Sequence, residues 1–418
     1  MIRIIPISDV GEFADKTRPA SGQTADVSDI IRDVRKDGDS ALARYEEMFG
    51  GRYSARISQE RVAEAHDQIT QGQRNAIVEM RDRLVGVETL LRESLQDMTA
   101  RIGSTTVSRR FVPLKSVGCY VPGGLAKYPS SAVMSVSTAK VAGVPRVVVI
   151  TPSAADGVDP VTLAAADICG ADEIYGVGGA HGVAALAYGT KTIQRVDKIV
   201  GPGGRFVTAA KLAVSNAVSI DMLAGPTELA VIADESADPT YVAADIIAQA
   251  EHSEDTFCCA ITTSGKVADR IQEAIADMVP KTRRHKIVDA SLSENGFIAV
   301  CRNWEDAARL AETLAPEHLQ IMTKSPEEMA SRVQSAGLVL TGHNSPSPAS
   351  DYLLGTNHIL PTGTGGRTRG ALSVLDFVKL VTTVSTDIES LTKIAGHMKE
   401  ITASEGLPGH YESVRCRI

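Results

Sequence analysis

The second half of the chain carries four short segments rich in side chains that can bind a metal ion. They supply an amide oxygen, imidazoles and carboxylates, which are the ligands that a catalytic divalent metal accepts. Because no two segments are adjacent in the sequence, only the fold can bring them together. The segments are Gln249-Ala-Glu-His252, Pro316-Glu317-His318-Leu319, Asp351-Tyr-Leu-Leu-Gly-Thr-Asn-His358 and Glu405-Gly-Leu-Pro-Gly-His410. Together they predict one site centred on a metal ion.

Each segment is ambiguous by itself. Gln249 and His252 lie three residues apart on a predicted helix, so both could hold the same ion, but a polar helix end has the same pattern. Asp351 and His358 lie in a glycine-rich loop, where ordinary turns also use such residues. His410 lies near the C-terminus, where a lone histidine usually has no role.

Glu317 and His318 follow Pro316 at the end of a predicted helix, 304–314. An adjacent glutamate and histidine can serve as two bases, one for the substrate proton and one for water. The dipeptide is common by chance, so it gains meaning only beside the other segments. The turn 220–228 adds the hydroxyl of Thr227 and a carboxylate where two lobes would meet, although a plain turn explains it equally well.

Three glycine-rich turns could cradle a phosphate. Val200-Gly-Pro-Gly-Gly-Arg205 joins a predicted strand to a helix, where backbone N–H groups are free to bind pyrophosphate. Gly176-Val-Gly-Gly-Ala-His-Gly182 and Tyr120-Val-Pro-Gly-Gly124 are similar. None has the G-x-G-x-x-G spacing, so tight structural turns remain the alternative. Arg367 and Arg369 could meet an anion or face solvent, and we expect Arg369 to face solvent.

Composition limits the class of protein. The chain has 418 residues, 43% hydrophobic and 22% charged, which is typical of a globular protein with two larger lobes. A net charge of −8 argues against nucleic-acid binding. No run approaches the roughly 18 apolar residues of a membrane span, and the N-terminus lacks a signal-peptide pattern. Six cysteines are too few for a disulfide scaffold, and Cys258 and Cys259 should be buried thiols on opposite faces of a strand. We therefore expect a cytoplasmic protein that binds neither nucleic acid nor membranes.

Alternating strands and helices predict the fold class. Residues 25–100 have helical spacing, and two series of short apolar runs alternate with helices from residue 146, which implies parallel sheets covered on both faces. A loop region follows Gly342, then helical stretches at 373–381 and 386–404 and a tail from Glu405 without a core of its own. The predicted strands are 146–151, 173–177, 196–200, 229–233, 258–262, 297–301 and 337–341, and the predicted helices between them are 160–168, 178–187, 240–250, 265–278 and 304–314.

The order of these motifs resembles the histidinol dehydrogenase family over nearly the whole chain. Further motifs of the resemblance are Val117-Gly-Cys-Tyr-Val-Pro-Gly-Gly124, Val196-Asp-Lys-Ile-Val-Gly-Pro-Gly203 and Ile220-Asp-Met-Leu-Ala-Gly-Pro-Thr-Glu228. The resemblance implies zinc-assisted, NAD-dependent oxidation of L-histidinol to L-histidine through the aldehyde. It also implies a homodimer in which the C-terminal tail completes the active site of the partner.

The resemblance assigns roles to particular residues. The implied zinc ligands are Gln249, His252, Asp351 and His410, and the implied bases are Glu317 and His318. All of these except Glu317 would also contact the substrate, together with Thr227, His358 and Glu405. The implied cofactor contacts are Tyr120, His181 and Gly204.

The chain departs from the family pattern at several of these positions. Thr227 replaces a serine, His181 a glutamine and Gly204 an asparagine. Two alternatives therefore stay open. One is a relative that oxidises another alcohol, such as a sulfopropanediol dehydrogenase, for which Arg369 would be the anion-binding residue. The other is a metal-bound relative without activity.

The expected fold is α/β, with two doubly wound, incomplete Rossmann-like lobes with parallel sheets, a helical N-terminal region and an extended C-terminal tail. We expect residues 1–118 to pack with the first α/β lobe and residues 119–227 to form the second lobe on the cofactor side. Residues 228–371 would continue the first lobe with the metal and catalytic residues, and 372–418 would be a helical tail crossing to the partner subunit.

Overall fold

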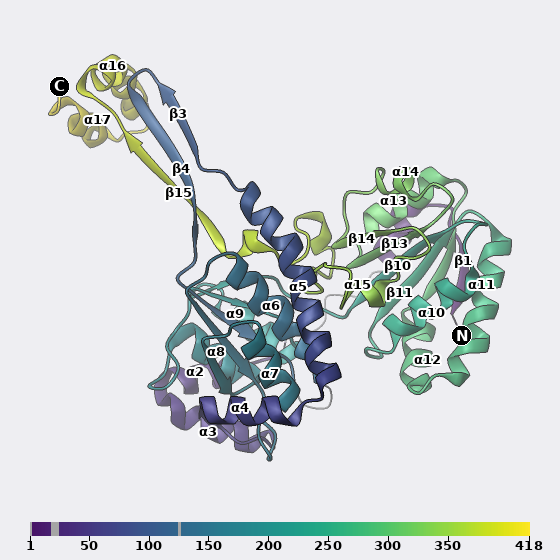
Figure 1. Ribbon diagram of the computed structural model, residues 1–418. Helices are drawn as coiled ribbons and strands as arrows, with labels where there is room; N and C mark the ends of the chain where they lie inside the picture. The colour runs from purple at the N-terminus through teal and green to yellow at the C-terminus, as the bar shows by residue number, and fades with distance from the viewer. Residues whose placement is uncertain (1, 18–24, 124–126) are drawn as a thin grey trace.

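The computed structural model describes residues 2–17, 25–123 and 127–418. It consists of two α/β lobes and a long three-stranded extension, which leaves one lobe and ends in two helices (Figure 1). None of the helices within these described ranges is long and apolar enough to cross a membrane.

The first lobe is built on a six-stranded sheet in which all neighbours are parallel. The chain runs from β10 outward through β11 and β12 and then returns to β13 on the other side of β10. The middle strands are buried on both faces, which is why they appear in the sequence as continuous apolar runs. In spatial order the strands are β1 (Arg3–Pro6), β12 (Phe297–Val300), β11 (Phe257–Thr262), β10 (Glu228–Ala233), β13 (His318–Met322) and β14 (Leu338–Thr341).

Helices cover both faces of this sheet. One face packs against α10 (Pro239–Ala250), α11 (Gly265–Met278) and α12 (His285–Glu294). The other packs against α1 (Val10–Thr17), α13 (Trp304–Leu314) and α14 (Pro326–Ala330). Cys258 and Cys259 are buried free thiols in these two separate clusters, as the sequence predicted.

The second lobe has its own six-stranded sheet, parallel except for β2 at one edge. Its strands, in spatial order, are β2 (Ser54–Arg56), β7 (Glu173–Gly176), β6 (Arg146–Thr151), β5 (Ser116–Tyr120), β8 (Lys198–Val200) and β9 (Ser219–Ile220). One face packs with α4 (Gln59–Gln68), α5 (Gln71–Ser94), α6 (Pro129–Val141) and α7 (Pro160–Ile168), and the other with α2 (Ser28–Asp37), α3 (Asp39–Met48), α8 (Gly179–Tyr188) and α9 (Arg205–Val214). The doubly wound α/β class with two parallel sheets is thus confirmed.

The N-terminal region is divided between the lobes. Strand β1 joins the first sheet beside β12, and α1 packs on α13. Helices α2 to α5 instead pack on α6, α7 and α8 of the second lobe, which differs from the expectation that residues 1–118 lie with the first lobe. Buried residues such as Leu42 and Leu84 belong to the two cores of the second lobe, and this burial fixes where the helices dock.

The extension combines segments from distant parts of the sequence. Strand β15 (Val378–Ser385) pairs antiparallel with β4 (Thr105–Pro113), which pairs with β3 (Met98–Ile102). Helix α16 (Ile388–Ser404) and helix α17 (Pro408–Arg415) follow at its far end (Figure 1). The predicted helical stretch 373–381 is wrong: it holds one short turn, η3 (Val374–Asp376), and the start of β15. The β-branched residues of 378–385 favour a strand, but the partner strand is far away in sequence.

Three further short elements complete the loop region after β14. They are α15 (Ser347–Ser350), η2 (Gly365–Arg367) and the η3 turn, while η1 (Val279–Lys281) follows α11. Strand β13 was also not predicted, because its five buried residues directly follow the Pro316-Glu317 turn and carry the polar His318 and Gln320.

Candidate active site

Polar side chains gather where β10 and β13 begin. Thr227 directly precedes β10, and Glu317 directly precedes β13. The two strands are parallel neighbours, with Leu229 opposite His318, so their amino ends lie side by side. Glu317 is only 7% exposed and His318 only 2%, which makes this pair the buried centre of the site.

A chain of hydrogen bonds connects α10 to Glu317. Nε2 of Gln249 donates to Oγ1 of Thr227 at 2.5 Å, and this hydroxyl donates to Oε2 of Glu317. The backbone N–H of Glu228 donates to the same carboxylate oxygen at 2.9 Å. Burial raises the pKa of Glu317, although His318 and these donors oppose the shift. Glu317 is therefore a stronger base than an ordinary glutamate.

His318 faces acceptors on both ring nitrogens. Nδ1 lies 3.3 Å from the carbonyl oxygen of Glu228, and Nε2 lies 3.2 Å from Oδ1 of Asp351. Burial disfavours the charged ring, but the hydrogen bond to Asp351 and the charge of Glu317, 3.7 Å away, outweigh it and raise the pKa of His318. The ring is thus oriented by a backbone carbonyl on one nitrogen and a carboxylate on the other, with the Glu317 carboxylate close by.

His358 connects this cluster to the second lobe. Its Nδ1 donates to the carbonyl oxygen of Asp351 at 2.8 Å, and Nε2 lies 3.4 Å from the hydroxyl of Ser131 on α6. Burial lowers the pKa of His358, so the ring is neutral. The site therefore lies at the junction of the two lobes. Ser131 was not identified from the sequence because its helix, 129–141, is otherwise an ordinary buried helix.

His252 lies just beyond α10 and remains exposed. Desolvation by the surrounding protein lowers the pKa of this imidazole. The charge of Asp351 opposes the shift, and that of His318 adds to it. His252, Asp351 and Gln249 offer a neutral imidazole, a carboxylate and an amide oxygen. Because Thr227 uses the amide nitrogen of Gln249, the carbonyl oxygen is left for another partner. This donor set suits zinc.

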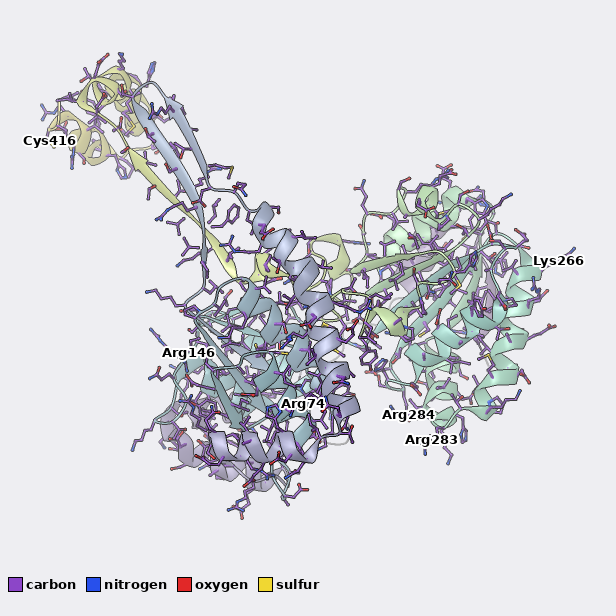
Figure 2. All side chains as sticks on the ribbon, in the orientation of Figure 1. Arg74, Arg146, Lys266, Arg283, Arg284 and Cys416 are labelled. Atoms are coloured by element: carbon purple, nitrogen blue, oxygen red, sulfur yellow. The ribbon has the colours of Figure 1, made fainter. Side chains whose placement is uncertain are left out.

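The predicted C-terminal residues do not join this cluster within one chain. Glu405 caps α16, His410 lies in α17, and both are exposed. Figure 1 shows these helices at the far end of the extension, and Figure 2 shows Cys416, close behind His410 in sequence, at its tip. Among the residues that the structure describes, no group of three or more His, Cys, Asp or Glu side chains could hold a metal ion. The four-ligand set therefore stays a prediction.

Comparison with known proteins agrees with the motif order. The family model described as histidinol dehydrogenase matches residues 15–418. The chain is 42% identical to the histidinol dehydrogenase of Haloarcula marismortui over 97% of this chain and 96% of that one, and 40% identical to that of Bacillus cereus over 94% and 91%. The crystal structure of histidinol dehydrogenase from Elizabethkingia anophelis superposes with a TM-score of 0.94 at 28% identity, covering 100% of this chain and 98% of that chain.

The chain belongs to the histidinol dehydrogenase family. It is thus an oxidoreductase, and the half-buried Thr227 and the buried Glu317 and His318 lie together at the amino ends of β10 and β13. The methyl group of Thr227, where the resemblance implies serine, does not prevent its hydroxyl from bridging Gln249 and Glu317.

On the expected cofactor side of this family member, His181 is enclosed by its own lobe. It is 2% exposed, and its Nε2 lies 2.9 Å from Oε1 of Glu46 on α3. Its ring stacks with Tyr45 and Phe49 at centroid distances of 5.8 and 5.9 Å. The hydroxyl of Tyr120, also buried, accepts from the N–H of Gly179 at 3.2 Å. Both side chains support the turn before α8, and their assignment as cofactor contacts stays a prediction. Gly124 lies outside the described residues.

The turn at α9 is open. A Cβ atom at Gly204 would meet nothing within 4 Å, and Gly204 is the N-cap of α9. Gly201 has φ +113°, and a Cβ atom there would collide with the carbonyl oxygen of Tyr120, so only glycine fits. A buried ion pair between Lys211 and Asp221 stabilises the turn. Nζ of Lys211 donates to the carbonyl oxygen of Gly201 at 3.0 Å, and the N–H of Gly201 donates to Oδ2 of Asp221 at 2.8 Å. These features fit a helix N-terminus that binds a phosphate.

Arg369 does not face solvent as predicted. Its Nη2 donates to Oδ1 of Asp376 at 2.7 Å, and its Nη1 donates to the carbonyl oxygen of Asp221. Lys198 reaches the same Asp376 oxygen at 3.1 Å. The prediction was wrong because the partner, Asp376, lies in a short turn that local patterns did not reveal. Arg367 donates to the carbonyl oxygen of Thr313 at 2.7 Å.

Proposed function

We propose that this protein oxidises L-histidinol to L-histidine through the aldehyde, with zinc and two molecules of NAD per turnover. The observation that carries the proposal is the Thr227–Glu317–His318–Asp351 network, built around the buried Glu317 and His318, in a chain of the histidinol dehydrogenase family. The overall change consumes one water and two NAD⁺ and gives the carboxylate, two NADH and three protons.

Gln249, His252 and Asp351 would hold zinc, with His410 as a fourth ligand. When bound, zinc would act as a Lewis acid toward the alcohol and the aldehyde oxygen. The free carbonyl oxygen of Gln249 and the lowered pKa of His252 support this assignment, because a metal binds the neutral imidazole. NAD would be held by backbone N–H groups at the α9 turn around Gly204, where a phosphate has room.

The bases are His318 and Glu317. The raised pKa of His318 makes its neutral ring a stronger base, and we assign to it the hydroxyl proton of the alcohol. Glu317 takes a proton from the water that adds to the aldehyde, giving the hydrate from which the second hydride leaves. His358 and Glu405 would bind the amine and imidazole of the substrate, whose donors match a neutral ring and a carboxylate.

We further propose that the protein works as a homodimer. Its extension exposes Leu380, Val384, Ile394, Ile401 and Leu407, an apolar surface that a second copy would cover. Because His410 and Glu405 lie on the same extension, docking on a second copy would deliver them to the cluster of that partner. The homodimer, the zinc ion and the cytoplasmic location all stay predictions.

A substrate with an anionic sulfonate has less support. Arg369, the cation that such a substrate would need, already pairs with Asp376. The inactive-relative alternative is opposed by the complete Glu317–His318 pair in its buried setting.

The test is NADH formation with L-histidinol, with zinc or with a chelator. We expect two NADH per histidinol in zinc and a loss of rate in the chelator that added zinc restores. The matched control is Glu294→Gln, an exposed glutamate at the end of α12, which should keep full activity. Zinc-loaded protein that forms no NADH from L-histidinol would contradict the proposal.

A further inference from the structure

A buried polar pair joins α10 to β13 next to the active site. Nε2 of Gln320 donates to Oδ2 of Asp245 at 2.8 Å, and the two residues are 0% and 7% exposed. The rest of this interface is apolar, with Val242 and Ile246 from α10 and Met322 from β13 in the same core cluster. A carboxylate and an amide in such surroundings need an explanation.

The pair is poorly suited to stabilise the fold. Burial raises the pKa of Asp245, which means that the protein disfavours its charge. Oε1 of Gln320 is buried without a hydrogen-bond partner among the described residues. Two apolar side chains would avoid both costs. A hydrogen bond differs from apolar packing in one respect, because its direction fixes the relative position of the helix and the strand.

The position of the pair links it to the site. Asp245 lies one helical turn before Gln249, on the same face of α10. Gln320 lies two residues after His318, on the same face of β13. Both neighbours of the pair make contacts within the site. Gln249 donates to Thr227 at 2.5 Å, and Nε2 of His318 lies 3.2 Å from Asp351.

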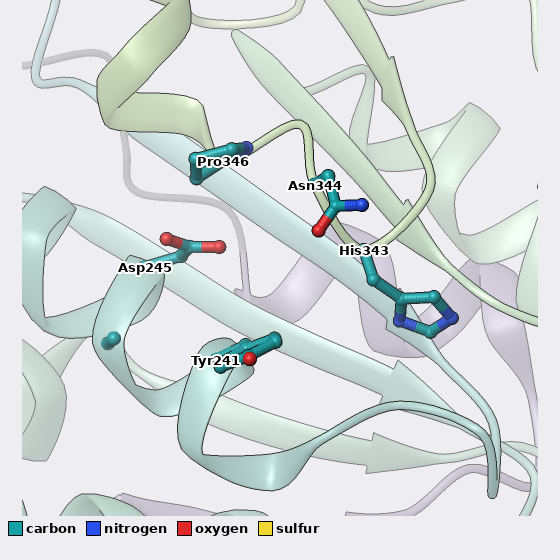
Figure 3. A pocket seen from close by; sticks show the side chains of 6 residues that line it. Tyr241, Asp245, His343, Asn344 and Pro346 are labelled. Atoms are coloured by element: carbon teal, nitrogen blue, oxygen red, sulfur yellow. The ribbon is translucent and has the colours of Figure 1, made fainter.

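The opposite end of this interface is open. Asp245 lines a cleft of about 330 Å³ together with Tyr241, His343, Asn344 and Pro346 (Figure 3). Tyr241, which also lines this cleft, is 52% exposed. The hydrogen bond to Gln320 ties α10 to β13 one helical turn before the bond of Gln249 to Thr227.

We propose that Asp245 and Gln320 are positioning residues, a buried clamp that sets the separation of α10 and β13 and thereby places Gln249 against Thr227 and His318 against Asp351. This inference rests on the proposed function, in which Gln249 and Asp351 hold zinc, His318 takes the substrate proton, and Thr227 bonds the second base, Glu317. Neither clamp residue touches the substrate.

The test replaces the clamp by an apolar pair in the full-length protein, Asp245→Val with Gln320→Met. We expect an unchanged or higher melting temperature, a kcat at least tenfold lower with a nearly unchanged KM, and zinc affinity weakened severalfold in a chelator competition. A merely structural pair would show the reverse, with a lower melting temperature and an unchanged kcat.

Two single variants separate geometry from charge and guard against a misfolded double variant. Asp245→Asn can form two hydrogen bonds with Gln320, so kcat should stay within about threefold of wild type. Asp245→Ser is too short to reach Gln320, so kcat should fall as in the double variant. The matched control is Ser291→Ala on α12, which removes a buried 3.0 Å bond to the carbonyl of Thr256 and should lower the melting temperature without changing kcat.

Each outcome is decisive. Full kcat and zinc affinity in both the double variant and Asp245→Ser would overturn the clamp, and so would a loss in Asp245→Asn equal to that in Asp245→Ser. A wild-type protein that neither binds zinc nor oxidises L-histidinol would instead reject the proposed function and the clamp with it. Wild-type activity distinguishes the two failures.

Discussion

Two distant regions hold the residues of one expected site, and they differ in burial and in hydrogen bonding. One is the cluster at the start of β10 and β13, and the other is the end of the C-terminal extension. In the cluster, Glu317 and His318 are buried; Glu317 accepts hydrogen bonds from Thr227 and the N–H of Glu228, and His318 lies within hydrogen-bond distance of Asp351. At the end of the extension, Glu405 and His410 are exposed and far from the cluster in the same chain (Figure 1). A single chain thus positions the two proposed bases, but it does not bring together the complete set of proposed zinc ligands. Proton transfer would then depend on the fold of one chain, and zinc binding on the assembly of two.

The largest expected effect comes from removing the buried base. Glu317→Gln keeps the shape and can still accept from Thr227, but it cannot take a proton from water. We expect kcat to fall by about 10²–10⁴-fold while the fold is kept, as measured by NADH formation and circular dichroism. Activity within tenfold of wild type would show that Glu317 is not the base.

The second prediction tests whether the extension acts on the partner. Glu317→Gln and His410→Ala should each be nearly inactive, because one lacks the base and the other a zinc ligand. After subunits of the two variants are exchanged, half of the dimers are mixed, and each holds one intact site if the tail acts across the dimer. The mixture should therefore recover about a quarter of wild-type activity. No recovery, with mixed dimers demonstrated by mass spectrometry, would place the tail on its own chain.

The third prediction concerns the hydroxyl between Gln249 and Glu317. Thr227→Val removes a donor that lowers the pKa of Glu317, so this pKa should rise further above that of an ordinary glutamate. Because the base must be deprotonated, the acidic limb of the kcat profile should move to higher pH. At neutral pH the rate should drop by about 10–100-fold, since two buried groups lose a partner. Thr227→Ser, the matched control, should keep both rate and profile.

The smallest expected effect lies in the second lobe. Gly204→Asn adds an amide where the chain has open space, so it should fold normally. One new hydrogen bond to the dinucleotide would contribute about 1 kcal/mol and lower the Kd for NAD about fivefold, as measured by fluorescence titration. His181→Gln, at the enclosed position, should lower stability instead, because it breaks the contact with Glu46. If His181→Gln changed the Kd for NAD and Gly204→Asn did not, the cofactor would have to be assigned to a site near α8.

Much of the fold could be predicted from the sequence, for a physical reason. Parallel strands buried on both faces appear as apolar runs, so β6, β10 and β11 were found close to their true bounds. Contacts between distant segments leave no such local trace. The pairing of β15 with β4, the docking of α2 to α5 on the second lobe and the Arg369–Asp376 ion pair were missed for that reason.

The candidate site follows the same division. Gln249, Thr227, Glu317, His318, Asp351 and His358 were singled out by residue type and spacing, and the family resemblance implied their roles. The structure brings them together. Local patterns could not show that Glu228 would bond the site through its backbone, or that Ser131 would reach it from another lobe. They also could not show that His181 is enclosed by Glu46, since α3 lies far from it in sequence.

The pairing of β15 with β4 has a consequence for maturation of the enzyme. Strand β15 must dock on β4, which is synthesised much earlier, before the extension can form. In the proposed dimer, an isolated chain cannot then complete turnover, so activity appears only after encounter with a second copy. Recovery after dilution should accordingly follow second-order kinetics.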